Sequence, residues 1–312
     1  MIYIKIIKLF CKWLPPIVSQ KLRSLLISNN YAKKCSNEIA ARSVTGSYLT
    51  ININGFYDLP FYINGYFDWR VLAIAKAVCD LKGSIIEVGS NIGTETIAFI
   101  DIVNVQSKVY AFEPVPVLLK KLKALENRNK NLNVYPFAIS NSNNFVKFDL
   151  PGSQNNSGIG HILINERNKN RFIDVECRKL DFFLNTFQKI SLIHIDAEGS
   201  DLNVILGAKK IIKRDQPIII AELSPKLLMR YDQDVKIFIA TLNQFGYSVH
   251  NISRLSTRKF KTHFLKFNKN VICVPSNQKE ILSKINKMLF FAGILPMIKH
   301  LNPLKIVKQK DY

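Results

Sequence analysis

The stretch Ile85-Ile-Glu-Val-Gly-Ser-Asn-Ile-Gly-Thr94 decides the fold class of this chain. Its apolar run enters a glycine-containing turn and continues into a helical pattern, and a second apolar run, Val109-Tyr-Ala-Phe-Glu-Pro114, ends on an acid. This order is typical of a doubly wound α/β sheet that holds an adenosine cofactor, with the turn under the cofactor and the acid on its ribose. We expect cofactor contacts from these residues: Glu87, Gly89, Ser90, Asn91, Gly93, Thr94 and Glu113.

The spacing of the glycines distinguishes between adenosine cofactors. A dinucleotide site needs G-x-G-x-x-G, but Asn91 and Thr94 stand where the two later glycines would be. Glu87 would repel a diphosphate, whereas it would attract the sulfonium and ammonium groups of S-adenosylmethionine. The pattern therefore favours S-adenosylmethionine, and an NAD-dependent oxidoreductase is the alternative.

A third segment, Ser191-Leu-Ile-His-Ile-Asp-Ala-Glu-Gly199, predicts a strand that ends in an acidic turn. Ligands of open α/β sheets bind outside the carboxyl ends of the strands, and alternate residues of a strand face one way. We therefore expect His194, Asp196 and Glu198 to form a catalytic row that deprotonates or anchors the methyl acceptor. The alternatives are a helix cap for Asp196, a first-turn acid for Glu198 and a buried histidine for His194.

His161 is a second candidate base, because it follows the polar loop at Ser157-Gly158. The mixture of Asp, Glu and His could hold a divalent cation, but no fixed ligand spacing supports this, so we predict no metal site.

In order and spacing, these motifs resemble those of the FkbM family of S-adenosylmethionine-dependent methyltransferases. The resemblance covers residues 80–225 and rests on the segments Glu87–Gly93, Phe112–Pro114, Ala138–Ser140, Ser157–Gly158, Ile195–Gly199, Leu206–Ala208 and Pro217–Glu222. Three positions depart from the family pattern: Glu87 replaces the commoner Asp, Ala197 replaces Val or Ile, and His194 replaces Lys.

The resemblance implies a Rossmann-like, mostly parallel sheet of the class I methyltransferases. It adds three residues to the expected cofactor site: Pro114, Ala138 and Ser140. The implied activity is O-methylation, frequently of sugars in bacterial surface polysaccharides or of secondary metabolites.

Other methyl acceptors fit the sequence less well. Base amino groups are often methylated from an Asn/Asp-Pro-Pro-Tyr/Phe loop after the fourth strand, where this chain has Asp196-Ala-Glu-Gly199. A cysteine nucleophile for pyrimidines usually follows a proline, and no Pro-Cys occurs. We therefore rank nucleic acid below a hydroxyl of a glycan or small molecule.

Composition describes a folded, strongly basic protein. The formal net charge is +21, which is compatible with an anionic partner or with a general bias toward lysine, since the lysines scatter along the chain. A basic binding protein without catalysis is thus a further alternative. The five cysteines show no Cys-x-x-Cys pair, which argues against zinc and disulfides and favours a cytoplasmic location.

Three regions follow from the pattern: a lead-in at 1–78, a methyltransferase domain at 79–276 with a β-rich insertion at 144–184, and a basic, amphipathic, helical tail at 277–312. Residues 35–66 are expected to form strand and loop, and 68–81 a helix capped by Asp68 or a neighbour. Strands are expected at 84–89, 108–113, 133–139, 191–196 and 217–223, followed by an antiparallel edge from 247–252 and 270–274.

The two ends of the chain suggest a membrane surface. A helix ending at Pro15-Pro16 would carry Lys5, Lys8 and Lys12 on one side and apolar residues on the other. We expect residues 1–16 and 284–310 to contact an anionic membrane peripherally, which would place the enzyme at the inner face, beside lipid-linked glycans. The alternative is that both ends pack on the core or form a dimer surface. The sequence leaves the oligomeric state open.

Overall fold

The central sheet of the computed structural model is built from the apolar runs of the sequence. The structure describes residues 2–27, 38–150, 160–163, 172–261 and 269–306. In chain order, the eight strands of this sheet are β3 (Ser84–Val88), β4 (Val109–Phe112), β5 (Leu132–Tyr135), β10 (Ile190–Ile195), β11 (Ile218–Leu223), β12 (Tyr247–Ile252), β13 (Thr257–Lys259) and β14 (Lys269–Pro275).

The strand order is β13-β12-β14-β11-β10-β3-β4-β5. The five strands from β11 to β5 are parallel, and β14 runs antiparallel to both of its neighbours. This confirms the predicted doubly wound, mostly parallel sheet with its antiparallel last strands. The winding changes direction between β3 and β10, which is where such sheets bind ligands.

One expected strand is divided between two sheets. Residues 133–139 were predicted as a single strand, but β5 ends at Tyr135 and β6 (Ala138–Ile139) pairs in a separate sheet. Pro136 lies at the division, and a proline can donate no hydrogen bond to a ladder. The single-strand prediction was therefore wrong, although both halves are extended.

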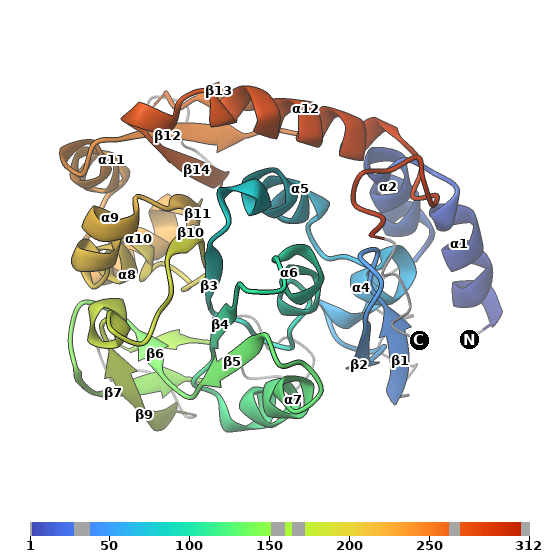
Figure 1. Ribbon diagram of the computed structural model, residues 1–312. Helices are drawn as coiled ribbons and strands as arrows, with labels where there is room; N and C mark the ends of the chain where they lie inside the picture. The colour runs from blue at the N-terminus through green and yellow to red at the C-terminus, as the bar shows by residue number, and fades with distance from the viewer. Residues whose placement is uncertain (1, 28–37, 151–159, 164–171, 262–268, 307–312) are drawn as a thin grey trace.

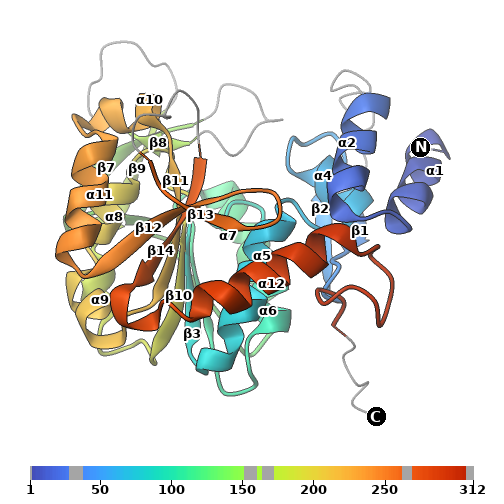
Figure 2. The same cartoon turned by 90° about the horizontal axis from the view of Figure 1, so that it is seen from above.

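Helices cover both faces of the sheet (Figures 1 and 2). One apolar core lies under α5 (Trp69–Val78), α6 (Thr96–Ile102) and α7 (Pro116–Glu126). The other core lies under α8 (Asp201–Leu206), α9 (Lys209–Asp215), α10 (Pro225–Leu228) and α11 (Val235–Gln244). The sheet strands are buried on both faces, as continuous apolar runs require.

The helix after the lead-in begins where the sequence indicates. The Asp68 side chain accepts the backbone N–H of Arg70 at 2.9 Å, which confirms the predicted cap of α5. The last helix, α12 (Ile281–Ile294), packs along α5. An added Cβ at Gly293 would lie 2.8 Å from the Trp69 ring, so the C-terminal helix belongs to the core.

The lead-in contains more helix than expected. It consists of α1 (Ile2–Lys12), α2 (Pro16–Leu26), a hairpin of β1 (Glu38–Arg42) and β2 (Tyr48–Asn52), and α4 (Asp58–Asn64). The prediction of strand and loop for 35–66 was wrong for α4, which buries Leu59, Phe61 and Ile63. Gly65 ends this helix in the left-handed region. Within the described ranges, no helix has both the length and the hydropathy that crossing a bilayer requires.

A small second sheet forms where the sequence alternates between apolar and polar residues. Its strand order is β6-β9-β7-β8, with β7 (Asn144–Asp149), β8 (His161–Ile162) and β9 (Phe172–Arg178) from the expected insertion. The expected loop at 151–158, which includes Ser157-Gly158, lies outside the described residues.

Gly207 tests how tightly the second sheet is held to the first. It has ordinary helical dihedrals, but an added Cβ would lie 2.1 Å from the carbonyl oxygen of Ser140, next to β6. We expect Gly207→Ala to lower the free energy of unfolding by about 3 kcal/mol, because backbone must move. Gly246→Ala is the matched control: it has open space but a φ of +79°, so its cost is about 1 kcal/mol. Urea denaturation measures both, and equal losses would contradict the contact.

Candidate active site

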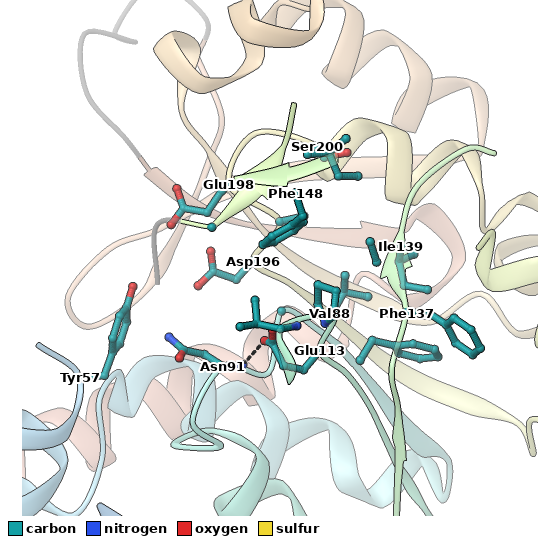
Figure 3. Close-up of a pocket in the computed structure, with 18 residues that line it drawn as sticks. Tyr57, Val88, Asn91, Glu113, Phe137, Ile139, Phe148, Asp196, Glu198 and Ser200 are labelled. Carbon is teal, nitrogen blue, oxygen red and sulfur yellow. Dashed lines mark hydrogen bonds between the residues drawn. The ribbon is translucent and has the colours of Figure 1, made fainter. Parts of the chain in front are cut away.

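A pocket opens at the carboxyl ends of β3, β4 and β10, and the second sheet forms one of its walls (Figure 3). Figure 3 shows Tyr57, Asn91, Asp196 and Glu198 on one side and Phe137 and Ile139 on the other. The predicted residues that line it are Gly89, Asn91, Glu113, Pro114, Ala138, Asp196 and Glu198. This position is the one that the strand order indicates for a ligand.

The turn after β3 depends on glycine. Gly89 has a φ of +83°, and an added Cβ would lie 2.1 Å from the carbonyl oxygen of Asp196. The backbone N–H groups of Gly89 and Ser90 both donate to the carbonyl oxygen of Phe112, at 3.0 and 3.1 Å. The turn therefore lies directly against the ends of β4 and β10, the two strands that supply the acids of the site.

Glu113 connects the two cofactor motifs. One carboxylate oxygen accepts the backbone N–H of Asn91 at 2.8 Å, and the other accepts that of Val115 at 2.9 Å. Because a carboxylate oxygen has two lone pairs, each keeps one for a ribose hydroxyl. Burial raises the pKa of Glu113 to about 7. The side chain lines the pocket, as a ribose-binding acid must.

Glu87 lies below the pocket and not in its lining. It is 2% exposed, accepts a hydrogen bond from the Thr96 hydroxyl, and has its pKa raised to about 8 by burial. The structure therefore places no direct contact between this acid and the pocket. Its charge could act on a bound cation only from beneath the turn.

Other expected cofactor residues stabilise the turn after β3 through contacts outside the pocket. The Ser90 hydroxyl donates to the carbonyl oxygen of Glu87 at 3.5 Å, and the Thr94 hydroxyl donates to Glu95. Gly93, with a φ of +90°, packs toward Leu122 of α7. Ser90, Gly93 and Thr94 do not appear among the pocket-lining side chains.

The opposite side of the pocket is apolar. Pro114 and Ala138 line it together with Phe137, Ile139 and Phe148, which suits the flat, weakly polar base of an adenosine. Ser140 does not line the pocket, and its carbonyl oxygen faces Gly207. Of the three residues that the family resemblance added, two therefore reach the pocket.

Asp196 and Glu198 enter the pocket from the turn after β10. The chain leaves extended geometry there, with a φ of +49° at Glu198 and +101° at Gly199. Burial raises the pKa of Asp196 well above its usual range, and repulsion from Glu198 and Glu222 adds to this effect. Burial and Glu222 raise the pKa of Glu198 to about 7, whereas Arg230 opposes the shift.

No group of the described chain donates a hydrogen bond to the Asp196 or Glu198 carboxylate. The neighbouring Asp201 is different, because it accepts the backbone N–H groups of Gly199 and Glu222 at 3.2 and 3.3 Å. Asp201 therefore stabilises the turn, and Asp196 and Glu198 keep their acceptor capacity for a ligand.

His194 does not join these two acids. Its Nδ1 lies 4.0 Å from a Glu87 carboxylate oxygen, and its ring meets Phe99 edge to face at 5.8 Å. Burial lowers the pKa of His194 to about 4, so the ring is neutral at physiological pH. The expected His-Asp-Glu row is divided, because the strand ends at Ile195 and the turn redirects Asp196 and Glu198.

His161 is buried in β8 of the second sheet. It is 6% exposed, and its Nδ1 is 3.9 Å from an Asp149 carboxylate oxygen. Its neighbours Gly160 and Ile162 line the pocket, but His161 does not. Within the described ranges, no three His, Cys, Asp or Glu residues are arranged to hold a metal ion.

Tyr57 is a pocket residue that the sequence analysis missed. It precedes α4 in the lead-in, more than 130 residues from the acids that it faces, and its ring packs on Phe67 with centroids 4.6 Å apart. Burial raises its pKa, and the charges of Asp196 and Glu198 raise it further. The only signal in the sequence was the abundance of tyrosine in the lead-in, which does not point to one residue.

The sheet order and the pocket are those expected of a class I methyltransferase, and the match to a methyltransferase family makes S-adenosylmethionine the cofactor. The methyltransferase FkbM domain matches residues 87–249, and the chain belongs to this family. The family replaces the NAD-dependent oxidoreductase that the sequence left as an alternative. No protein with a curated description matches the chain.

Three solved structures are similar to this chain at low identity. The FkbM methyltransferase of Methylobacillus flagellatus is 13% identical, with a TM-score of 0.39, over 87% of this chain and 58% of that one. The chain thus spans less than two thirds of that protein. Aeropyrum pernix fibrillarin, in complex with S-adenosyl-L-methionine, is 12% identical, with a TM-score of 0.40, over 77% of this chain and 84% of that one. A Streptococcus thermophilus rRNA methylase is 13% identical, with a TM-score of 0.38, over 65% and 93%.

Replacing Glu113 tests its contact with the ribose. We expect Glu113→Gln to weaken S-adenosylhomocysteine binding by about 1.5–3 kcal/mol, because charge-assisted hydrogen bonds are lost while the shape is kept. Titration calorimetry measures the affinity, and Glu126→Gln on α7 is the control for a general effect of removing an acid. Unchanged affinity in Glu113→Gln would contradict the assignment.

Proton release on cofactor binding is a second expectation. A cation among Glu113, Asp196 and Glu198 favours their ionised forms, so binding at pH 7 should release protons from groups whose pKa is raised. Calorimetry in buffers of different ionisation enthalpy measures this release. It should be larger for S-adenosylmethionine than for S-adenosylhomocysteine, which lacks the positive sulfur. Equal release, or uptake, would show that these acids do not sense that charge.

Proposed function

We propose that this protein transfers the methyl group of S-adenosylmethionine to a hydroxyl group of a sugar in a bacterial surface glycan or a related small molecule. The observation that carries the proposal is the pair Asp196 and Glu198. Both carboxylates line the cofactor pocket, and neither receives a hydrogen bond from the described part of the chain. They are therefore available as acceptors for hydroxyl groups of a second substrate.

The cofactor, when bound, supplies a methyl group that is already activated by the positive sulfur. The remaining task of the protein is to align a hydroxyl oxygen and to accept its proton as the new C–O bond forms and the C–S bond breaks. We assign Asp196 as the base that accepts this proton. A carboxylate whose pKa is raised toward neutrality is a stronger base than an ordinary aspartate, so the environment of Asp196 suits this role.

The composition of the rim favours a sugar over a nucleic acid. Tyr57 presents an aromatic ring and a hydroxyl beside the two carboxylates, and a sugar offers both apolar C–H faces and several hydroxyl donors. The phosphates of RNA would instead approach the carboxylates of Asp196 and Glu198. This local negative charge opposes the net charge of +21, which by itself would suit nucleic acid.

Asp196→Asn tests the assignment of the base. We expect turnover to fall by about 10²–10⁴, the usual worth of acid–base catalysis, while S-adenosylhomocysteine affinity changes little. The measurement is transfer of a labelled methyl group from S-adenosylmethionine to surface glycans from a deletion strain. In the wild type, kcat/KM should rise with pH in a range well above that of an ordinary aspartate, because the base must be ionised and its pKa is raised. The variant should lose this pH dependence.

Two outcomes would overturn the proposal. If Asp196→Asn turns over normally, Asp196 only shapes the turn after β10. If the wild type binds cofactor but transfers no methyl group to any glycan fraction, the alternative of a binding protein without catalysis would gain support. Glu280→Gln, an exposed acid before α12, is the control that should leave both binding and turnover unchanged.

A further inference from the structure

The first helix has two apolar sides, and only one of them packs on the protein. Ile4, Ile7 and Cys11 are buried where α1 contacts α2 and α4. On the other side, large apolar side chains face solvent: Ile2 is 77% exposed, Leu9 60%, Phe10 62% and Trp13 60%. At 3.6 residues per turn, this second group is centred nearly opposite the buried one. Packing within the chain therefore covers only one of the two apolar sides of α1.

The exposed apolar surface continues from α1 onto α2. The Tyr3 hydroxyl donates to the carbonyl oxygen of Leu26 at 3.0 Å, which brings the start of α1 to the end of α2. We call the exposed apolar residues of these helices the α1–α2 face: Ile2, Tyr3, Ile6, Leu9, Phe10, Trp13, Val18, Leu25 and Leu26. Both helices lie at one end of the molecule, away from the central sheet (Figures 1 and 2).

The charge around this face has one sign. Lys5, Lys12 and Lys21 are exposed, and Lys8 is half-buried with its ammonium 3.8 Å from the centre of the Tyr62 ring. The sequence contains no acid before Glu38. The α1–α2 face is thus an apolar surface with exposed lysines beside it and no acid in either of its helices.

We propose that the α1–α2 face binds the surface of an anionic membrane, with α1 lying in the plane of the interface. Helices of this kind insert their aromatic and aliphatic side chains at the level of the headgroups, while lysines at the border contact anionic lipids. The proposal is independent of the methyl acceptor. It concerns where the protein is located, and not what the pocket does.

Two other occupants fit the charges less well. A symmetric dimer through this face would bring the lysines of one copy against those of the other, since the same patch meets itself. A protein partner of ordinary composition offers no excess of negative charge to these lysines, whereas an anionic bilayer does. An anionic bilayer accepts both the apolar surface and its cationic border.

One helix, α4, connects the α1–α2 face with the pocket. α4 packs against α1, and Tyr57, the residue before α4, lines the pocket. α1 would lie between α4 and the bilayer, so docking would fix the orientation of the Tyr57 side of the pocket relative to the membrane surface.

The two tryptophans provide a native probe. Trp13 is 60% exposed on the face, whereas Trp69 is 2% exposed in the core. With full-length protein and vesicles of phosphatidylcholine with 30% phosphatidylglycerol, we expect a blue shift of emission and quenching by brominated lipid. Vesicles of phosphatidylcholine alone should give neither change. Trp13→Phe should abolish both signals, since Trp69 does not reach lipid.

Variants separate the apolar and the charged contributions. Lys5→Gln with Lys12→Gln should lower the partition coefficient about 25-fold at low salt, because each lysine near the surface is worth about fivefold. Lys120→Gln with Lys121→Gln on α7 is the matched control and should have no such effect. Ile6→Ser with Phe10→Ser should abolish flotation, and Val105→Ser with Val117→Ser, which also removes exposed apolar residues, should not. Affinity for S-adenosylhomocysteine, measured for every variant, shows that the fold is intact.

The proposal would be overturned if the wild type failed to float with the anionic vesicles at low salt. It would also be overturned if Ile6→Ser with Phe10→Ser floated as well as the wild type. If sedimentation instead showed a dimer that these two substitutions dissociate, the face would be an interface between copies of this chain.

Discussion

The close approach of Gly89 to the carbonyl oxygen of Asp196 is the contact on which the site depends. There is no room for a Cβ at this point, so the turn after β3 and the end of β10 touch through their backbones. Glu113 adds the third strand, because its carboxylate accepts the backbone N–H of Asn91 from the same turn. The acid expected to bind the ribose and the acid assigned as base are therefore positioned by one turn, through a backbone contact at Asp196 and a hydrogen bond between backbone and carboxylate at Glu113.

Buried acids gather in and around the pocket of a strongly basic protein. Glu87, Glu113, Asp196 and Asp201 all have their pKa values raised, chiefly because they are buried. In the folded chain without a ligand, this burial opposes ionisation of the acids. A cationic cofactor relieves part of that cost, since it favours the carboxylate forms. The burial of these acids thus favours S-adenosylmethionine over S-adenosylhomocysteine, which lacks the positive sulfur.

The sequence predicted the local elements well and the long-range contacts poorly. Apolar runs and turn residues placed four of the five parallel strands within one residue, and Asp68 marked the start of its helix, because these signals are local. The strand predicted at 133–139 is divided at Pro136, because its first half pairs with β4 and its second half pairs with β9 of the other sheet. Tyr57 could not be assigned to the pocket, because its position depends on how the lead-in packs. We grouped His194 with Asp196 because alternate residues of a strand face the same way. This rule applies only within the strand, and β10 ends at Ile195.

The lead-in connects the two proposals physically. Its α4 is held from one side by α1, with Lys8 over the Tyr62 ring, and Tyr57 at its start reaches the acids of the pocket. A bilayer that binds the exposed side of α1 cannot replace the buried side, because Ile4 and Ile7 are already packed on the protein. Docking would therefore leave the core unchanged and restrict only the orientation of the molecule. A restricted orientation favours an acceptor that is itself held at the membrane, because both reactants then meet on a surface and not in the whole volume.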